Sequence, residues 1–487
     1  MPRQTRRTFL KRASAAGLGA GIVIAGTKAS GRVLGANDTI RVGVAGIHGR
    51  GGSHIGAFAG MKGVQVTHLI DPDSRLFASR SGQVKSKGGN TPKCFQDIRK
   101  ALEDKDLDAV SIASCNHWHS LLTILSCQAG KDVYVEKPCS HNVFEGRKCV
   151  EAARKHQRIV QHGTQRRSMA RWARQIAAIA SGKYGKLLVS KGYASKVRWS
   201  IGFKEPKDPP PELDYDLWLG PAPMQPYNEN FVHYNWHWFW DFGNGEIGNQ
   251  GVHQMDIARW AIEAATGATG PKSAISMGGR FGYKDQGQTP NMQLCVYDYG
   301  GTLLVFEVRG LVGKKGKGGE QFARKVTNEF YLEEGAIIGG QFYPKGKNKP
   351  EKLVEAESTV RSGGHFGNFI DCVRSRKQED LNADILQGHY AAAPCHLGNI
   401  SYRLGQEVPL GQEPAGFPLE CPQVRESLDT IKANLKAALG IDPDKAKWTL
   451  GPKLAFDPEK EKFLDHPKAD ELLTRKYRDP YVMPEEA

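Results

Sequence analysis

The sequence predicts an α/β protein in which a doubly wound parallel sheet is followed by an α+β domain with a large, open, mainly antiparallel sheet. Up to about residue 163, short apolar runs alternate with helical stretches, and a glycine-rich turn follows the first run. Beyond that point, several strand-like runs follow one another with no helix between them. Helices between successive strands imply parallel pairing, whereas consecutive strands imply antiparallel pairing.

The first half reads as a nucleotide-binding fold of about 130 residues. The strand-like runs are Ile40–Gly46, Val64–Asp71, Asp108–Ser114, Val133–Val135 and Arg158–Gly163. The first helical stretch ends at about Lys62, and the second follows Asp71. The later ones are Asp97–Asp104, Leu121–Gly130 and Val143–His156.

The second half begins with a helix at Arg171–Gly182, and strand-like runs such as LLVSKGYAS and KSAISMGG follow. Tyr299–Gly301 separates two apolar runs and predicts a hairpin. We therefore divide the chain into a signal and linker (1–35), an NAD-binding domain (36–165), a substrate and oligomerisation domain (166–413) and a C-terminal extension (414–487). The extension is rich in Pro, Lys and Asp, and we expect it to wrap the surface or mediate subunit contact.

The composition is that of a globular protein, with 39% hydrophobic and 24% charged residues. The net charge of +15 does not favour nucleic-acid binding, because six basic residues fall in the first 29 positions and no dense basic run follows. Those first residues include TRRTFLKR (Thr5–Arg12) before a mildly apolar run, which resembles a twin-arginine export signal. We expect a periplasmic or other extracytoplasmic protein with no membrane span once mature; a basic tail on a cytoplasmic protein is the alternative.

The turn after the first strand suits a dinucleotide. It holds Gly46, His48, Gly49, Arg50 and Gly51, with His48 where the usual pattern has its second glycine. Such turns bring main-chain N–H groups at a helix N-terminus against a pyrophosphate. The next strand ends in Asp71, placed to bind the adenosine ribose and to repel a 2′-phosphate, so NAD is expected rather than NADP.

Several separated motifs resemble the Gfo/Idh/MocA oxidoreductase family. They are SCNHWHS (Ser114–Ser120), VYVEKP (Val133–Pro138), GTQRRS (Gly163–Ser168), the Trp236–Trp260 segment and HFGNFIDCVRSRK (His365–Lys377). The resemblance implies a sugar or polyol dehydrogenase that forms homo-oligomers. It also implies a catalytic group of Lys137, His253 and Asn249, the last standing where sugar dehydrogenases commonly carry Asp. The expected cofactor-binding residues are those of the glycine turn with Asp71, Asn116, His119, Glu136, Lys137 and Gln165.

Other residues of the same segments favour supporting roles. Asp256 is expected to be structural, and Trp236, Trp238 and Trp240 to lie mainly in the core. A metal site from His233, His237 and His253 is conceivable, but nothing in their spacing demands one.

An exported dehydrogenase cannot rely on free NAD, which implies a tightly held cofactor. The leading hypothesis is therefore an exported NAD-dependent oxidoreductase acting on a secondary hydroxyl of a sugar, a polyol or a sugar derivative. An NAD-dependent glycosidase that works by transient sugar oxidation and elimination is the first alternative. A non-catalytic sugar- or nucleotide-binding protein is the second.

Overall fold

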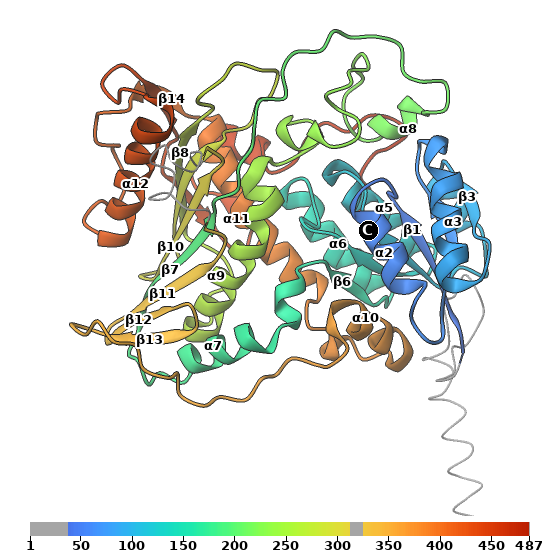
Figure 1. Cartoon of the computed structure of the whole chain (residues 1–487), viewed down its shortest axis with the longest axis horizontal. Coiled ribbons are helices and arrows are strands. Elements are labelled where there is room, and N and C mark those ends of the chain that lie inside the picture. Colours follow the sequence, from blue (N-terminus) through green and yellow to red (C-terminus); the bar gives the residue numbers. More distant parts are fainter. Residues whose placement is uncertain (1–37, 312–324, 487) are drawn as a thin grey trace, which may run out of the picture.

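The computed structural model describes residues 38–311 and 325–486, so the expected export signal lies outside the described residues. Six parallel strands form the first sheet, in the order β3-β2-β1-β4-β5-β6 (Figure 1). Their bounds are Ile40–Ala45 (β1), Val64–Ile70 (β2), Lys93–Phe95 (β3), Ala109–Ile112 (β4), Asp132–Val135 (β5) and Val160–His162 (β6). This confirms the predicted doubly wound sheet. The sequence did not predict β3, a three-residue edge strand with little apolar pattern.

Helices cover both faces of this sheet, because alternate side chains of each strand point to opposite faces. One face carries Val42 and Val44 of β1 and packs against α2, α3 and α10. The other packs against α4, α5, α6 and part of α11. These helices are Arg50–Phe58 (α2), Phe77–Gly88 (α3), Ile98–Leu102 (α4), Asn116–Gln128 (α5), Val143–Lys155 (α6), Gly364–Ser375 (α10) and Ile385–Arg403 (α11).

The second sheet is mixed and mostly antiparallel, as predicted, with eleven strands in the described part of the chain. Its main path runs β13-β12-β11-β7-β10-β9-β8-β15-β14, and β16 pairs with β8 and β17. The predicted hairpin is present between β9 and β10, with Gly300 and Gly301 at positive φ. The bounds are Leu187–Ala194 (β7), Ser273–Gly279 (β8), Met292–Asp298 (β9), Leu303–Arg309 (β10), Asn328–Leu332 (β11), Gly335–Ile338 (β12), Gln341–Pro344 (β13), Gln406–Pro409 (β14), Lys447–Leu450 (β15), Leu454–Asp457 (β16) and Lys462–Phe463 (β17).

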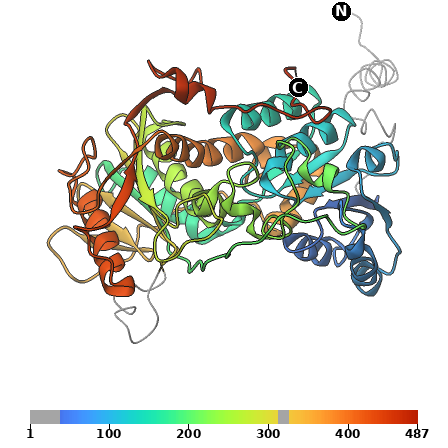
Figure 2. The same ribbon diagram turned by 90° about the horizontal axis from the view of Figure 1, so that it is seen from above.

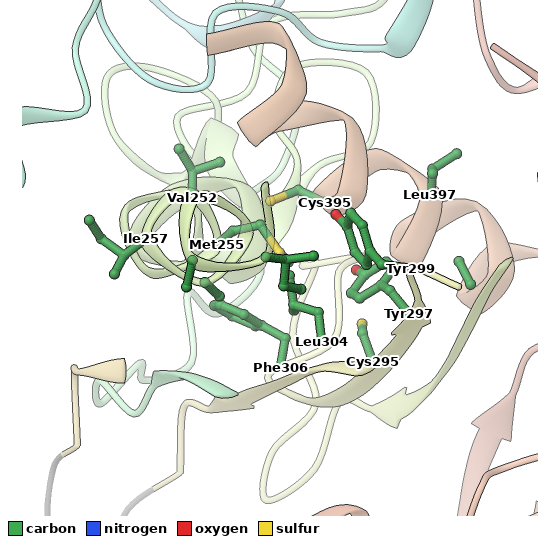
Figure 3. Packing of buried hydrophobic residues seen from close by; sticks show 14 of the residues in the cluster. Val252, Met255, Ile257, Cys295, Tyr297, Tyr299, Leu304, Phe306, Cys395 and Leu397 are labelled. Atoms are coloured by element: carbon green, nitrogen blue, oxygen red, sulfur yellow. The ribbon is translucent and has the colours of Figure 1, made fainter. Parts of the chain in front are cut away.

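One face of this sheet packs against α7 (Ala170–Ala180), α9 (Val252–Thr266) and α11. Figure 3 shows Met255 of α9 beside Leu304 and Phe306 of β10, with Cys395 of α11 on the same side. α9 enters this layer through a π turn at Ile247–Gly251. The packing fixes the start of α9 relative to both sheets, because α11 contacts α6 of the first domain as well as α9.

The C-terminal extension is more than a surface wrap, because it completes the second domain. Helix α12 (Pro422–Leu439) covers the opposite face of the second sheet, where Leu428 and Ile431 contact a cluster that includes Leu294 and Val305. The extension also supplies β15, β16, β17 and α13 (Pro467–Glu471). The chain then returns to the first domain (Figure 2). There Tyr481 and Met483 join the hydrophobic cluster that contains side chains of α5.

A long segment from about residue 195 to residue 246, which we call the strap, connects β7 to the π turn. It crosses above the first domain and contains the short helix α8 (Tyr215–Leu219) (Figure 1). Its apolar side chains form a cluster of their own, with Trp218, Phe231 and Phe242 among its members. Short 3₁₀ turns lie at Ser74–Leu76, Gln165–Ser168, Asn235–Trp238 and Gln378–Asp380. Among the described helices, none has the length and apolar character needed to cross a bilayer.

Candidate active site

A cavity of about 420 Å³ lies where the carboxyl ends of the first sheet meet the strap and the start of α9. In doubly wound sheets, ligands bind at this edge, where the strand order reverses between β1 and β4. Every residue expected to bind the cofactor or take part in catalysis lines this cavity, except Gly51. The structure thus brings residues from both domains into one site.

The glycine turn has the shape that a dinucleotide requires. Gly46 has φ +80°, and a side chain there would collide with the main chain of Ser114 in the neighbouring strand segment. A side chain at Gly51 would strike the Gly46 carbonyl, which explains why Gly51 packs behind the cavity. Gly49 faces open space at the N-terminus of α2, where no side chain caps the helix. The free N–H groups of this helix end therefore suit a pyrophosphate.

Asp71 lies at the end of β2 and is almost fully buried. Its carboxylate accepts hydrogen bonds from the main-chain N–H groups of Ile47 (2.9 Å) and Asp73 (3.0 Å). Each carboxylate oxygen keeps a further acceptor position, which suits the hydroxyls of a ribose. Burial raises the pKa of Asp71 to about 6, so the carboxylate is charged at neutral pH and opposes a 2′-phosphate.

His48, in place of the usual second glycine, connects the two halves of the site. Its ring stacks on that of His233 from the strap, with centroids 4.3 Å apart and planes at 7°. His233 in turn hydrogen-bonds Asp73 at 2.7 Å, and Arg75 makes a two-pronged contact with the same carboxylate. Arg75 is therefore held by Asp73, and Arg80, the other cation close to Asp71, donates to the carbonyl oxygens of Ile47 and His48.

Glu136 organises the floor of the cavity. Its Oε1 atom accepts hydrogen bonds from Arg50 (2.8 Å), His54 (3.1 Å) and Gln165 (3.2 Å). Burial opposes the charge, but the hydrogen bond and charge of His54 and the charge of Arg50 outweigh it and hold the pKa of Glu136 well below its usual value. Glu136 therefore stays ionised and fixes Arg50 at the start of α2.

Lys137, at the end of β5, reaches across the domain boundary to Asn249 in the π turn. Its Nζ donates to the main-chain oxygen of Asn249 (2.9 Å) and to the side-chain Oδ1 (3.2 Å). An ammonium group has three N–H bonds, so one remains for a ligand. Burial lowers the pKa of Lys137, against the opposing charges of Glu136 and Glu246. π turns are rare and are frequently found at functional sites.

Asn249 is itself oriented by a carboxylate. Its Nδ2 donates to Glu246 at 3.4 Å, and Glu246 forms a two-pronged ion pair with Arg198. The negative charge that an aspartate would carry is thus present one side chain farther from Lys137, and Arg198 balances it. The amide transmits orientation to the amine without adding a charge of its own.

His253 lies one turn after Asn249 and lines the same cavity. Its Nδ1 atom is buried and has no hydrogen-bond partner in the described part of the chain. Burial, together with the positive charge of Lys137, lowers the pKa of His253 well below its usual value. The imidazole is therefore neutral at neutral pH and able to accept a proton or a hydrogen bond.

Asn116 and His119, at the start of α5, hold the cavity wall together. Asn116 donates to Asn244 of the strap at 3.0 Å, and the His119 ring lies between the carbonyl oxygens of Pro138 (2.6 Å) and Ser114 (3.0 Å).

Asp256 is fully buried in an ion pair with Arg167, at 2.8 Å and 3.0 Å, and does not line the cavity. Its position agrees with the structural role expected from the sequence.

The strap supplies the opposite wall. The rings of Trp236 and His237 stack with centroids 3.6 Å apart and both line the cavity, whereas Trp238 and Trp240 do not.

Across residues 38–311 and 325–486, no group of three or more His, Cys, Asp or Glu side chains could hold a metal ion. Sequence reasoning did not identify Trp118, Leu217, Trp218 or Glu246 as parts of the site. Of these, Trp118 and Glu246 carried a signal, because Trp118 lies inside the Ser114–Ser120 motif and Glu246 inside the Trp236–Trp260 segment.

Family models match a part of each domain. Residues 40–164 match the Gfo/Idh/MocA model described as oxidoreductase family, NAD-binding Rossmann fold. Residues 179–271 match the companion model for the C-terminal alpha/beta domain of that family.

Two curated relatives illustrate the range of related proteins. A glycosyl hydrolase family 109 protein of Solibacter usitatus is 33% identical over 156 residues, which cover 30% of this chain and 35% of that protein. Inositol 2-dehydrogenase of Salmonella typhimurium is 28% identical over 156 residues, covering 32% of this chain and 45% of that enzyme. The chain thus spans less than half the length of either relative.

Solved structures share the fold at low sequence identity. The WlbA dehydrogenase of Bordetella pertussis, in complex with NADH and UDP-GlcNAcA, has a TM-score of 0.54 at 17% identity, covering 75% of this chain and 97% of that one. Levoglucosan dehydrogenase in complex with NADH has a TM-score of 0.53 at 14% identity, covering 85% and 100%. The two model matches show that residues 40–164 and 179–271 carry the two domains of the Gfo/Idh/MocA family of oxidoreductases, and the strand order β3-β2-β1-β4-β5-β6 agrees with the Rossmann fold of the first.

Proposed function

We propose that this protein is an NAD-dependent oxidoreductase that acts on a secondary hydroxyl of a sugar, a polyol or a sugar derivative. The observation that carries the proposal is the meeting of Lys137, Asn249 and neutral His253 in the cavity that the dinucleotide turn opens into. NAD, when bound there, accepts a hydride from the carbon that bears the hydroxyl.

Residues of this chain orient the substrate, accept its proton and bind the cofactor. Lys137 is oriented by two of its hydrogen bonds and directs its third N–H toward the reacting oxygen. His253, neutral because of burial and the nearby amine, accepts the hydroxyl proton. Gly49 and the open end of α2 bind the pyrophosphate, and Asp71 binds the ribose and selects NAD.

Cofactor content and substrate turnover together test this proposal. Purified protein, or protein incubated with NAD and desalted, is expected to release NAD on denaturation. A panel of sugars and polyols, followed at 340 nm, is expected to contain at least one substrate whose oxidation the Lys137→Ala variant does not catalyse. Protein that neither carries nor binds NAD would refute the proposal.

A second candidate is an NAD-dependent glycosidase, favoured by the relatives named glycosyl hydrolase family 109 proteins. Here a sugar hydroxyl is oxidised to a ketone, the acidified carbon beside the ketone loses a proton, and the glycosidic substituent leaves the next carbon along as a double bond forms. Water then adds to this double bond, and the ketone is reduced again by the hydride taken up in the first step. Because this sequence is redox-neutral, release of p-nitrophenol from p-nitrophenyl glycosides without net change at 340 nm would identify it. A non-catalytic binding protein would bind NADH and turn over neither type of substrate.

We propose that the protein is exported through the twin-arginine route, with its cofactor loaded before export. The paired arginines Arg6 and Arg7 before an apolar run support this, and all nine cysteines are free thiols, as suits a protein that folds in the cytoplasm. Replacing Arg6 and Arg7 by lysine is expected to retain the protein in the cytoplasm. Equal amounts of both forms outside the cytoplasm would contradict the export proposal alone.

A further inference from the structure

The far wall of the cavity is made by three side chains that the sequence did not assign to the site. Leu217 and Trp218 belong to α8 of the strap, and Trp118 belongs to α5. They line the cavity together with Gln96, Asp97 and Ile98, beyond the end of edge strand β3. Any ligand that extends along the sheet edge from the glycine turn past Asp71 therefore lies under α8.

α8 has five residues and cannot be a stable helix by itself, since isolated helices of this length are not formed in water. It is held from below by α5. The Trp118 indole N–H contacts the carbonyl oxygens of Leu217 (3.0 Å) and Trp218 (3.1 Å), and the ring of His117 hydrogen-bonds the Trp218 carbonyl at 3.0 Å.

The last part of the C-terminal extension holds α8 from outside. Arg478 donates from Nε to the carbonyl oxygen of Gly220 (3.0 Å) and from NH2 to that of Asp216 (2.8 Å), and its NH1 pairs with the Asp216 carboxylate at 2.5 Å. Tyr481 donates its hydroxyl hydrogen to the other oxygen of the Asp216 carboxylate at 2.9 Å. The Asp216 carbonyl already accepts the main-chain N–H of Gly220 at 2.9 Å, so Arg478 adds a second bond to it, and the Gly220 carbonyl at the end of α8 receives its bond from Arg478.

Tyr481 also contacts the cavity wall directly. Its ring packs edge-on against Trp118, with centroids 5.4 Å apart, and the Arg99 guanidinium lies over it at 5.2 Å. One residue thus contacts both parts of the wall, α8 through Asp216 and α5 through Trp118.

The segment that carries these residues is anchored on both domains. Arg475 donates to the carbonyl oxygen of Asp241 at 2.9 Å, and Asn142 donates to the Tyr477 hydroxyl at 3.2 Å. The main-chain N–H of Phe144 donates to Leu473 at 3.0 Å. Figure 2 shows the C-terminal end of the chain lying on the first domain, far from the second sheet where the extension begins. Outward movement of α8 therefore requires these contacts to break.

We propose that residues 472–483 form a clasp in which Arg478 and Tyr481 act as positioning residues: they hold α8 and Trp118 against the cavity and slow the exchange of the bound nicotinamide dinucleotide. The proposal rests on the proposed function, because it presumes that NAD occupies the cavity. It supplies a physical means of keeping a cofactor that is not released in each catalytic cycle. The carboxylate of Asp216 is half-exposed, so the bonds to main-chain carbonyls, more than the ion pair, give the clasp its strength.

The test measures NADH exchange with the full chain and needs no substrate. NADH fluorescence, followed after rapid mixing, gives the association rate, and displacement by excess NAD gives the dissociation rate. Arg478→Ala is expected to speed dissociation at least tenfold and Tyr481→Phe a few-fold, with partial recovery in Arg478→Lys. A wall that opens more often also speeds association, whereas mere damage to the pocket would raise the dissociation rate alone. Arg425→Ala, which removes an exposed arginine elsewhere in the extension, is the matched control and is expected to exchange NADH at the wild-type rates.

The outcomes separate the two proposals. If the wild-type protein binds no NADH, the proposed function fails and the clasp fails with it. If it binds NADH but Arg478→Ala and Tyr481→Phe exchange it at wild-type rates, the clasp is refuted and the proposed function stands. Should Arg478→Ala not fold, Tyr481→Phe and Arg478→Lys decide, because both keep most of the packing; wild-type exchange in these two variants would equally refute the clasp.

Discussion

The amine of Lys137, at the end of β5, donates a 2.9 Å hydrogen bond to the main-chain oxygen of Asn249, in the π turn that precedes α9. The two residues belong to different domains and are 112 positions apart in the chain. Their contact joins the carboxyl edge of the first sheet to the helix that carries His253. The chemistry of the cavity therefore depends on how the two domains are held together.

Replacing Lys137 by alanine is expected to lower kcat by about 10²- to 10⁴-fold, the usual worth of a positioned proton-transfer group. Folding stability should be unchanged or slightly improved, because the substitution removes a buried amine whose pKa burial has lowered. NADH titration and thermal unfolding of the same preparation check both statements. Wild-type kcat in this variant would remove Lys137 from the mechanism.

The pH profile of kcat/KM is expected to be bell-shaped. Activity should fall on the acid side as His253 gains a proton, at a pH below 6.5 because burial and Lys137 lower the pKa of His253. Activity should also fall on the alkaline side as Lys137 loses a proton. This limb is expected at a pH below 10.5, because burial lowers the pKa of Lys137. Asn249→Asp places a carboxylate against the amine and is expected to move the alkaline limb upward by about one pH unit or more. Gln250→Glu, which adds the same charge to the neighbouring residue, should move it less.

The raised pKa of Asp71 predicts that the preference for NADH over NADPH weakens at acid pH. Its carboxylate repels a 2′-phosphate only when ionised, and its pKa is about 6. The ratio of NADPH to NADH dissociation constants should therefore fall as the pH is lowered from 7.5 to 5.5. Asp71→Ser is expected to improve NADPH binding about tenfold or more and to abolish this pH dependence. A ratio that does not change between those pH values would show that Asp71 does not discriminate.

The fold is expected to lose stability in mild acid because of its buried histidines. Burial lowers the pKa of His117, His162, His237 and His396 to about 3 each, and that of His365 to about 4. In the unfolded chain each has a pKa near 6.5, so the unfolded state takes up more protons between these values and stability falls as the pH drops below 6.5. Each histidine contributes on the order of 1 kcal/mol of destabilisation at pH 5.5.

Asp71 acts in the opposite direction, since its raised pKa stabilises the fold as the pH falls from about 6. Glu145 and Glu246, whose pKa values burial also raises, act in the same direction as Asp71, but the buried histidines outnumber these carboxyl groups. Chemical unfolding at pH 7.5 and 5.5 measures the balance. His396→Asn should reduce the difference between the two pH values. Equal stability at both would contradict the assignment of these histidines as neutral in the fold.

Removing the Asp256 charge is expected to destabilise the fold by roughly 3–5 kcal/mol, because Asp256→Asn leaves the Arg167 guanidinium buried without a counter-charge. The exposed pair of Lys100 and Glu103 is the control, and Glu103→Gln should cost less than about 1 kcal/mol. Chemical unfolding measures both. Once folded at low temperature, the Asp256→Asn variant should keep the wild-type pH profile; a displaced acid limb would instead give Asp256 a part in proton transfer.

The sequence predicted the first sheet well, because its buried strands read as continuous apolar runs that end in glycine, Asp71 or Glu136. The same runs placed Gly46, Asp71 and Lys137 at one edge, since carboxyl ends of parallel strands meet there. The family resemblance supplied His253 and Asn249, which are far from that edge in the sequence.

Other parts of the structure depend on long-range packing that no local pattern records. The strap has few regular elements, so nothing in it indicated that Trp218 would reach the cavity. Glu246 became part of the site only because the π turn aligns it with Asn249 and Arg198. The extension looked like a surface segment because it is rich in Pro, Lys and Asp, and only the second sheet shows where the apolar side of α12 packs.

Helix α12 also changes what this protein can do with its second sheet. The family resemblance led us to expect homo-oligomers, for which an open sheet is one possible contact surface. The face of the second sheet opposite α9 is covered by α12, where Ser427 donates to Glu307 and Glu426 accepts from Lys191 of the strands beneath. A second copy approaching that side would meet Arg425, Asp429 and Lys436, which point to solvent, in place of a flat apolar surface. The extension thus covers these strands within one subunit, so a second copy on that side would contact the polar surface of α12 in place of the strands.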